Sequence, residues 1–228
     1  MKRTLGTLLL AAFLLVTGCA RLPFAVTEPV PMPADTTAAE LSVRTWTAVP
    51  QTLRMRQSGL FEFRGRRVPL VGFMVLDNAA ATARLVGMND LGVKFFDLEV
   101  GEKGVREHFV LPELAKYPGF AEAVASSVRR IFLTPRPARE DPLEIDPQEA
   151  RLVRREAGRN LTFVFGGRGP EWLETRAAGE KEEWRLRFFE YRCDNGLTYP
   201  AGIVLDDEKA GYRLTLWLES VKGSEDGN

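Results

Sequence analysis

The chain has 228 residues, with 31 lysines and arginines, 31 aspartates and glutamates, one histidine and two cysteines. This balanced charge gives no electrostatic basis for binding nucleic acid, and no run of basic residues stands out. A single histidine and two cysteines exclude a metal site built from a cluster of either residue. The composition therefore predicts no metal, no cofactor and no nucleic-acid partner.

The first residues are typical of an export signal. A short basic start precedes the apolar run from Leu5 to Val16, which is too short for a membrane span of about 20 residues. One interpretation is an ordinary signal peptide that is cut near Ala20. We favour a bacterial lipoprotein signal over residues 1–18, because Val16-Thr17-Gly18-Cys19 resembles the lipobox, whose cysteine becomes the first residue after cleavage.

The lipobox resemblance implies an anchor at Cys19. A diacylglycerol would be joined to the sulfur, so membrane lipid is an expected partner, and each buried CH₂ contributes about 0.8 kcal/mol. By analogy with lipoproteins of bacteria that have two membranes, Ala20 in place of an aspartate permits export to the outer membrane. We therefore expect the protein on the periplasmic face of the outer membrane. Lipidation of Cys19 leaves Cys193 without an intramolecular disulfide partner.

Two short helices are expected, one near the N-terminus and one near the middle of the chain. Residues 19–35 are predicted to be the lipidated cysteine and a proline-rich tether, of which little is expected to pack. Thr37-Ala38-Ala39-Glu40 has the spacing of a capping box and predicts a helix to about Trp46. A second helix is expected over 119–133, where apolar residues recur on one face.

Alternating apolar residues, with turn residues roughly every 8 to 12 positions, predict an antiparallel sheet. The expected strands are 51–64, 67–77, 82–88, 92–100, 104–111, 149–156, 160–166, 171–177, 183–193, 197–206 and 211–221, with an exposed acidic loop over 135–148. So many twisted strands should curl. The sequence thus predicts a mainly β (α+β) fold, a curled antiparallel sheet or half-barrel of about eleven strands closed by helices. It is expected to form one domain over 36–222, followed by a flexible tail over 223–228.

No catalytic motif accompanies these strands. The glycines of Gly166-Gly167-Arg168-Gly169 are followed by a strand, which indicates a turn and not a phosphate-binding loop. No serine or cysteine stands at a motif spacing from His108. The sequence therefore predicts a protein that is not an enzyme, and an envelope hydrolase is the least favoured hypothesis because a nucleophile–base pair is missing.

One stretch resembles a known family. Residues 84–100, RLVGMNDLGVKFFDLEV, look like a hairpin of LolB, the outer-membrane lipoprotein receptor, in which Asn-Pro-Leu-Gly joins two strands. Asp90 stands here in place of the proline. The resemblance covers roughly 41–111 and 197–221, including Ser58-Gly59-Leu60-Phe61 and the last hairpin, whereas the second half before residue 197 matches only in its alternation. The chain is identified as a divergent LolB-like member of the LolA/LolB superfamily.

The resemblance implies a curled sheet that holds acyl chains in an apolar cavity, with a LolA-like carrier as a possible partner. It also implies that Leu91 touches the bilayer, although the sequence permits this side chain to pack back against the sheet instead. The residues expected to line the cavity are Phe61, Phe63, Phe73, Phe163, Phe165, Leu186, Phe188, Leu214 and Leu216. The protein would then receive or transfer lipoproteins or other lipids. From periodicity alone a densely filled core is equally consistent, and it would make the protein an envelope assembly lipoprotein that binds a partner through a sheet edge.

Overall fold

The computed structural model describes residues 22–156 and 158–223. The predicted signal over 1–18, Cys19 and residues 224–228 lie outside the described residues. Among the described residues, no helix has both the length and the apolar character needed to cross a membrane.

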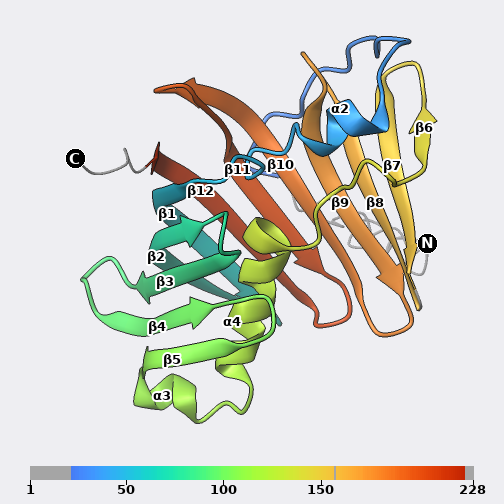
Figure 1. The fold of residues 1–228 in the computed structure, drawn as a ribbon. Helices are drawn as coiled ribbons and strands as arrows, with labels where there is room; N and C mark the ends of the chain where they lie inside the picture. The colour runs from blue at the N-terminus through green and yellow to red at the C-terminus, as the bar shows by residue number, and fades with distance from the viewer. Residues whose placement is uncertain (1–21, 157, 224–228) are drawn as a thin grey trace, which may run out of the picture.

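All the strands belong to one antiparallel sheet, which curls without closing (Figure 1). Their order across the sheet is β5-β4-β3-β2-β1-β12-β11-β10-β9-β8-β7-β6. The strands are β1 (Thr52–Phe63), β2 (Arg66–Asp77), β3 (Thr82–Met88), β4 (Lys94–Val100), β5 (Val105–Val110), β6 (Leu143–Ile145), β7 (Glu149–Glu156), β8 (Arg159–Gly166), β9 (Glu171–Gly179), β10 (Glu183–Asp194), β11 (Leu197–Asp207) and β12 (Tyr212–Gly223). Only the pairing of β1 with β12 joins strands that are distant in sequence. The predicted fold class is confirmed.

The sheet has twelve strands, one more than the sequence predicts. The additional strand, β6, lies inside the segment 135–148, which is expected to be an exposed loop. Leu143 of β6 pairs there with Leu152 of β7, which is fully buried. The strand β6 therefore forms one edge of the sheet. Three residues between prolines are too few to show an alternating pattern, which explains the error.

The helices lie at the edges and inside the curve of the sheet. The helix α2 (Ala38–Ser42) begins at Thr37, whose hydroxyl accepts a hydrogen bond from the amide of Glu40, as the capping box predicts. It ends four residues before Trp46. The helix α3 (Pro112–Ala115) follows β5. The helix α4 (Phe120–Val128) runs straight into a π-helical turn, η1 (Arg129–Leu133), and the two together match the predicted helix over 119–133.

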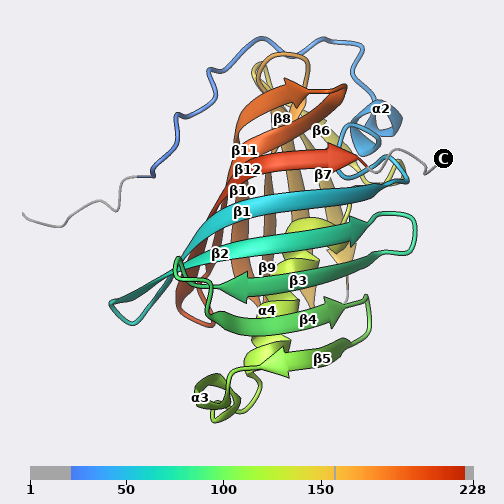
Figure 2. The same cartoon turned by 90° about the vertical axis from the view of Figure 1, so that its left-hand side faces the viewer.

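The core lies between the concave face of the sheet and the helical segment α4–η1 (Figures 1 and 2). Alternate residues of each strand point inward, and they meet in rows across the sheet. One row pairs Leu214 with Leu205 and Leu205 with Leu186. From the other side, Ile131, Phe132 and Leu133 of η1 are each 2% exposed. The core is therefore formed mainly by one curved face and the α4–η1 segment, to which Leu41 of α2 and Trp46 add.

The N-terminal segment packs on the opposite, convex face, contrary to the prediction that little of it would pack. Phe24 is buried against Phe189 and Val204 of the sheet, with Trp217 beside it. Farther along, the amide of Met32 donates to the carbonyl of Pro147. A proline-rich composition does not reveal that one aromatic residue within it meets an apolar patch on the sheet.

Candidate functional site

Five of the residues expected to line a cavity are deeply buried on the concave face. Phe163, Phe165, Leu186, Phe188 and Leu216 are each at most 2% exposed. They belong to one continuous core cluster that includes the side chains of η1. In this half of the sheet the interior is filled by side chains, since neighbouring aromatic rings such as Trp172 and Phe188 have centroids only 4.6 Å apart.

The other end of the concave face is more open. Phe61, Phe63 and Leu214 are only half-buried, and they share this end with Tyr212. The ring of Phe61 lies 5.4 Å from that of Tyr212 and 6.3 Å from that of Phe63, measured between centroids. These three aromatic rings form a continuous half-buried surface, which we call the aromatic mouth.

A charged groove of about 540 Å³ lies at this mouth. Its walls are the turn of the β1–β2 hairpin and the turn between β11 and β12. It is lined by Glu62, Phe63, Arg64, Gly65, Arg66, Arg67, Asp206, Asp207, Glu208, Gly211, Tyr212 and Arg213. Sequence reasoning missed the three arginines of the first turn, although Arg64-Gly65-Arg66-Arg67 is visible as a short basic cluster. Its signal is weak in the sequence because the surrounding charges balance.

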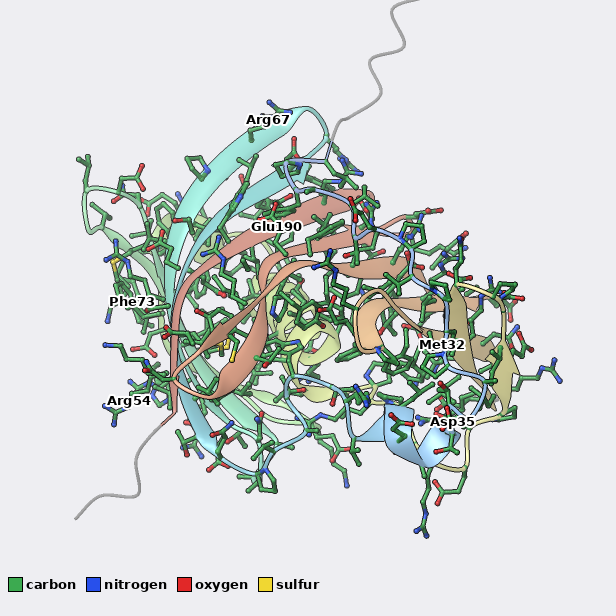
Figure 3. All side chains as sticks on the ribbon, turned by 90° about the horizontal axis from the view of Figure 1, so that it is seen from above. Met32, Asp35, Arg54, Arg67, Phe73 and Glu190 are labelled. Carbon is green, nitrogen blue, oxygen red and sulfur yellow. The ribbon has the colours of Figure 1, made fainter. Side chains whose placement is uncertain are left out.

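Phe73 does not line the interior, so its predicted role is wrong. The side chain is 44% exposed on the convex face, between the buried residues Gly72 and Met74 (Figure 3). The guanidinium carbon of Arg56 lies 6.0 Å from its ring centroid. Because the strand around Phe73 is apolar on both faces, the sequence pattern does not identify the inward-facing set, and an error of one position moves a side chain to the other face.

Leu91 projects into solvent from a hydrogen-bonded turn. It is 88% exposed, so it does not pack back against the sheet. The side-chain oxygen of Asn89 accepts hydrogen bonds from the amides of Leu91 (3.0 Å) and Val93 (2.9 Å). Gly92 has a φ of +79°, which favours glycine. The turn is thus held by its own hydrogen bonds and leaves the leucine side chain almost fully exposed among the described residues.

Polar contacts hold the helical segment against the groove. The hydroxyl groups of Ser127 in α4 and Tyr212 in β12 are 2.8 Å apart. Burial raises the pKa of Tyr212 above its ordinary value. Nearby, the guanidinium group of Arg130 in η1 lies 2.5 Å from the carboxylate of Asp207. The guanidinium carbon of Arg130 is 5.2 Å from the ring centroid of Trp184. The helix is therefore tied to the sheet by hydrogen bonds beside the aromatic mouth.

A second pocket, of about 210 Å³, lies on the other side of Arg130. Glu182 lines it and accepts hydrogen bonds from Arg159 (2.5 Å) and from the indole of Trp184 (2.8 Å). Burial alone would raise the pKa of Glu182, but these hydrogen bonds and the positive charge of Arg159 outweigh it and lower the pKa. The pocket is small and charged, and we assign it a structural role.

The remaining candidates do not gather into a reactive site. His108 is paired with Glu99 at 3.0 Å, and Cys193 is exposed near a hairpin turn. Within the described part of the chain, no group of three histidine, cysteine, aspartate or glutamate residues is placed to hold a metal ion. The absence of an enzymatic activity stays a prediction.

Comparisons with known proteins identify the type of fold. No family model matches the sequence, and no curated protein matches it. Among solved structures, the LolA superfamily protein NE2245 from Nitrosomonas europaea is 9% identical, with a TM-score of 0.53 over 82% of this chain and 93% of that chain. The chain has a LolA-like fold.

Two further structures are similar over a comparable length. A DUF1329 family protein from Desulfovibrio piger is 10% identical, with a TM-score of 0.49 over 84% of this chain and 93% of that one. A putative outer membrane lipoprotein-sorting protein domain from Vibrio parahaemolyticus is 10% identical, with a TM-score of 0.46 over 83% of this chain and 91% of that one. The fold assignment rests on the likeness to NE2245, and at 9% identity that likeness extends to the fold and not to the cargo.

Proposed function

We propose that this protein is a LolB-like lipoprotein that binds acyl chains of lipoproteins or other lipids and transfers them at the membrane. In this proposal, acylated Cys19 anchors it to the periplasmic face of the outer membrane. The LolA-like fold and the lipobox support the proposal from two independent directions. A periplasmic LolA-like protein is the expected donor of the cargo, and the protein carries out no covalent chemistry.

The observation that carries the proposal is the aromatic mouth. Phe61, Phe63 and Tyr212 leave apolar surface half-buried at one end of an otherwise packed interior. An acyl chain that covers this surface removes its own apolar area and that of the rings from water, which contributes about 25 cal/mol per Å². The mouth therefore gives acyl chains a place to begin binding.

Deeper binding requires the helical segment to move. Because Phe163, Phe188 and their neighbours fill the interior, a whole acyl chain fits only when α4 shifts away from the sheet. The polar contacts that resist this shift at the mouth end are Ser127 with Tyr212 and Arg130 with Asp207. Farther along the segment, the buried side chains of η1, which are part of the core, resist it as well. We infer that cargo displaces α4 at the mouth end first. Leu91 would enter the bilayer while the cargo leaves.

The test is native mass spectrometry on protein exported with Cys19→Ala and purified from the periplasm without detergent. A bound acylated protein supports the LolB-like receptor, and a bound phospholipid or glycolipid supports transfer of another lipid. Phe61→Asp, which adds charge to the mouth, should remove the bound species. The matched control is Phe73→Asp on the convex face, which should retain it.

A filled core favours a second function. The tight packing around Phe163, Phe165 and Phe188 is also what an assembly lipoprotein without a ligand would show. Such a protein would bind a partner through an edge of the open sheet, at β5 or β6. No bound lipid, together with no displacement of an apolar dye by added lipid, would favour this function over lipid transfer.

A further inference from the structure

The β1–β2 hairpin extends beyond the rest of the sheet. The last paired residue of β3, Met88, lies opposite Val71, so the residues of β2 from Arg66 to Leu70 have no neighbour on that side. On the other side β1 remains paired to β12 as far as Phe63. In Figure 2 the hairpin turn accordingly protrudes at the left, past the β3–β4 turn.

The turn of this hairpin is basic. Arg64 and Arg66 are exposed, and within the described residues neither makes a salt bridge. Arg67 is 2.8 Å from Glu62. The guanidinium carbon of Arg64 lies 4.9 Å from the ring centroid of Phe63, so the turn combines an aromatic surface with positive charge. We call Arg64, Arg66 and Arg67 the arginine tip.

The acidic residues across the groove are already neutralised. Asp206 is held by Arg187 at 2.7 Å and by Arg213 at 2.5 Å. Asp207 is held by Arg130. These pairs leave Glu208 as the only lining acid without a salt bridge in the described part of the chain. The groove therefore presents more free positive than negative charge on the side of the arginine tip.

The arginine tip lies at the end of the molecule where an anchored membrane would be. In Figure 2 the first described residues, in dark blue, reach the same left-hand side as the tip and the turn that exposes Leu91. Phe24 is docked on the sheet, and the five residue-to-residue steps from Cys19 to Phe24 span at most about 18 Å. Beside Leu91, Lys94 is 3.6 Å from the carboxylate of Asp97, so its charge is partnered. Arg64 and Arg66 of the arginine tip make no salt bridge among the described residues.

We propose that the arginine tip binds the phosphates of anionic phospholipid head groups and so orients the anchored protein on its membrane. Guanidinium groups bind phosphate oxygens with two parallel hydrogen bonds, and the nearby Phe63 suits the boundary between head groups and acyl chains. This places the groove and the aromatic mouth against the bilayer. The inference rests on the proposed membrane-anchored function and adds to it a preference for one class of lipid.

The test is vesicle flotation of protein exported with Cys19→Ala, so that no anchor dominates binding. The vesicles are phosphatidylcholine alone or phosphatidylcholine mixed with phosphatidylglycerol. Each interfacial arginine is worth about a fivefold change in binding, so Arg64→Gln/Arg66→Gln should bind the anionic vesicles roughly 25-fold more weakly. Added salt should reduce this difference, because it screens exposed charges.

The matched control removes two positive charges at the opposite end of β1 from the arginine tip, on β1 itself and on the neighbouring β12. Arg54 and Lys222 are paired across β1 and β12, are exposed, and make no salt bridge among the described residues. Figure 3 shows Arg54 and Arg67 at opposite ends of the hairpin. Arg54→Gln/Lys222→Gln should bind anionic vesicles as the parent protein does. An equal loss in both double variants would show that net charge alone acts, and would overturn the proposal.

The outcomes also separate this inference from the proposed function. Unchanged anionic-vesicle binding by Arg64→Gln/Arg66→Gln would overturn the role of the arginine tip. It would leave lipid transfer intact if native mass spectrometry still finds a bound acyl chain. If native mass spectrometry finds no bound lipid in any preparation, including the protein without the arginine substitutions, the transfer function is contradicted. That conclusion does not depend on the result of vesicle flotation.

Discussion

Phe24 stacks on Phe189 across the convex face of the sheet, with ring centroids 5.3 Å apart and planes inclined by 21°. The contact needs a glycine beneath it, because a Cβ atom at Gly202 would lie 2.4 Å from the Phe24 ring. The next amide, of Ala25, donates to the carboxylate of Glu190 at 3.0 Å. The N-terminal segment is thus fixed to the domain a few residues after the predicted anchor.

Replacing Phe24 should therefore release this segment. Phe24→Ala removes a ring that is 7% exposed, and burial of a phenylalanine contributes about 1.5–3 kcal/mol. The expected result is faster amide hydrogen exchange and faster proteolysis over residues 22–33, with a smaller change in the thermal stability of the sheet. Hydrogen exchange with peptide resolution measures it.

Gly202→Ala should have the same effect, since its methyl group occupies the space of the ring. Val26→Ala is the control, because Val26 is 77% exposed and its truncation should leave exchange unchanged. If all three variants exchange like the parent protein, the stacked contact does not hold the segment.

Leu91→Glu should leave the fold intact and reduce delivery of cargo to membranes. The side chain is 88% exposed and its turn is held by Asn89, so the substitution disturbs no packing. A carboxylate at this position resists entry into a bilayer, and transfer of a labelled acylated protein to vesicles should fall several-fold. Transfer and melting temperature are measured on the same preparations.

Ile145→Glu provides the matched control for this prediction. Ile145 is 45% exposed on β6, an edge strand far along the sheet from the β3–β4 turn. It should transfer cargo at the parental rate. Normal delivery by Leu91→Glu would remove the role that we give to Leu91.

The sequence predicts the sheet well because its strands are paired mostly with their neighbours along the chain. Turns such as Asp194-Asn195-Gly196 set the register of each hairpin locally, and Asn195 has a φ of +49°, the positive value that a type I′ turn requires. The closing pair, β1 with β12, follows once consecutive hairpins curl. The lipobox is equally local, although Cys19 lies outside the described residues.

The site is less predictable because it depends on which face each residue occupies. In the apolar run that contains Phe73, both faces are hydrophobic, so alternation gives no answer. Likewise, nothing local indicates that Phe24 meets Phe189, because the two are brought together by the tertiary fold. The filling of the interior by side chains also depends on the packing of many residues, and no short sequence motif indicates it.

Glu182 should make stability depend on pH in the acidic range. Its pKa is lowered in the folded protein by Arg159 and Trp184 despite burial, from a usual value of 4.5. The stabilisation is thus present above that value and is lost as the pH falls through the lower folded pKa. Glu182→Gln should destabilise the protein at pH 7, and the difference should shrink as the pH falls below 4.5.

Chemical denaturation between neutral and acidic pH measures this change. The neighbouring Glu183→Gln is the control, because Glu183 is exposed and makes no salt bridge among the described residues. A constant difference between Glu182→Gln and the parent protein at all pH values would mean that the substitution acts through packing and not through charge.

Tyr212→Phe should loosen the helical segment and speed the entry of apolar ligands. The substitution removes the hydroxyl that meets Ser127 at 2.8 Å and keeps the ring in the aromatic mouth. Because Ser127 still bonds the carbonyl of Ala123, the cost should be about 1 kcal/mol. If displacement of α4 limits entry, an apolar dye should bind faster to this variant, whereas Tyr117→Phe, at an exposed position, should match the parent protein. Stopped-flow fluorescence measures the rate. A destabilised Tyr212→Phe protein that binds the dye at the parental rate would show that ligands enter without moving α4.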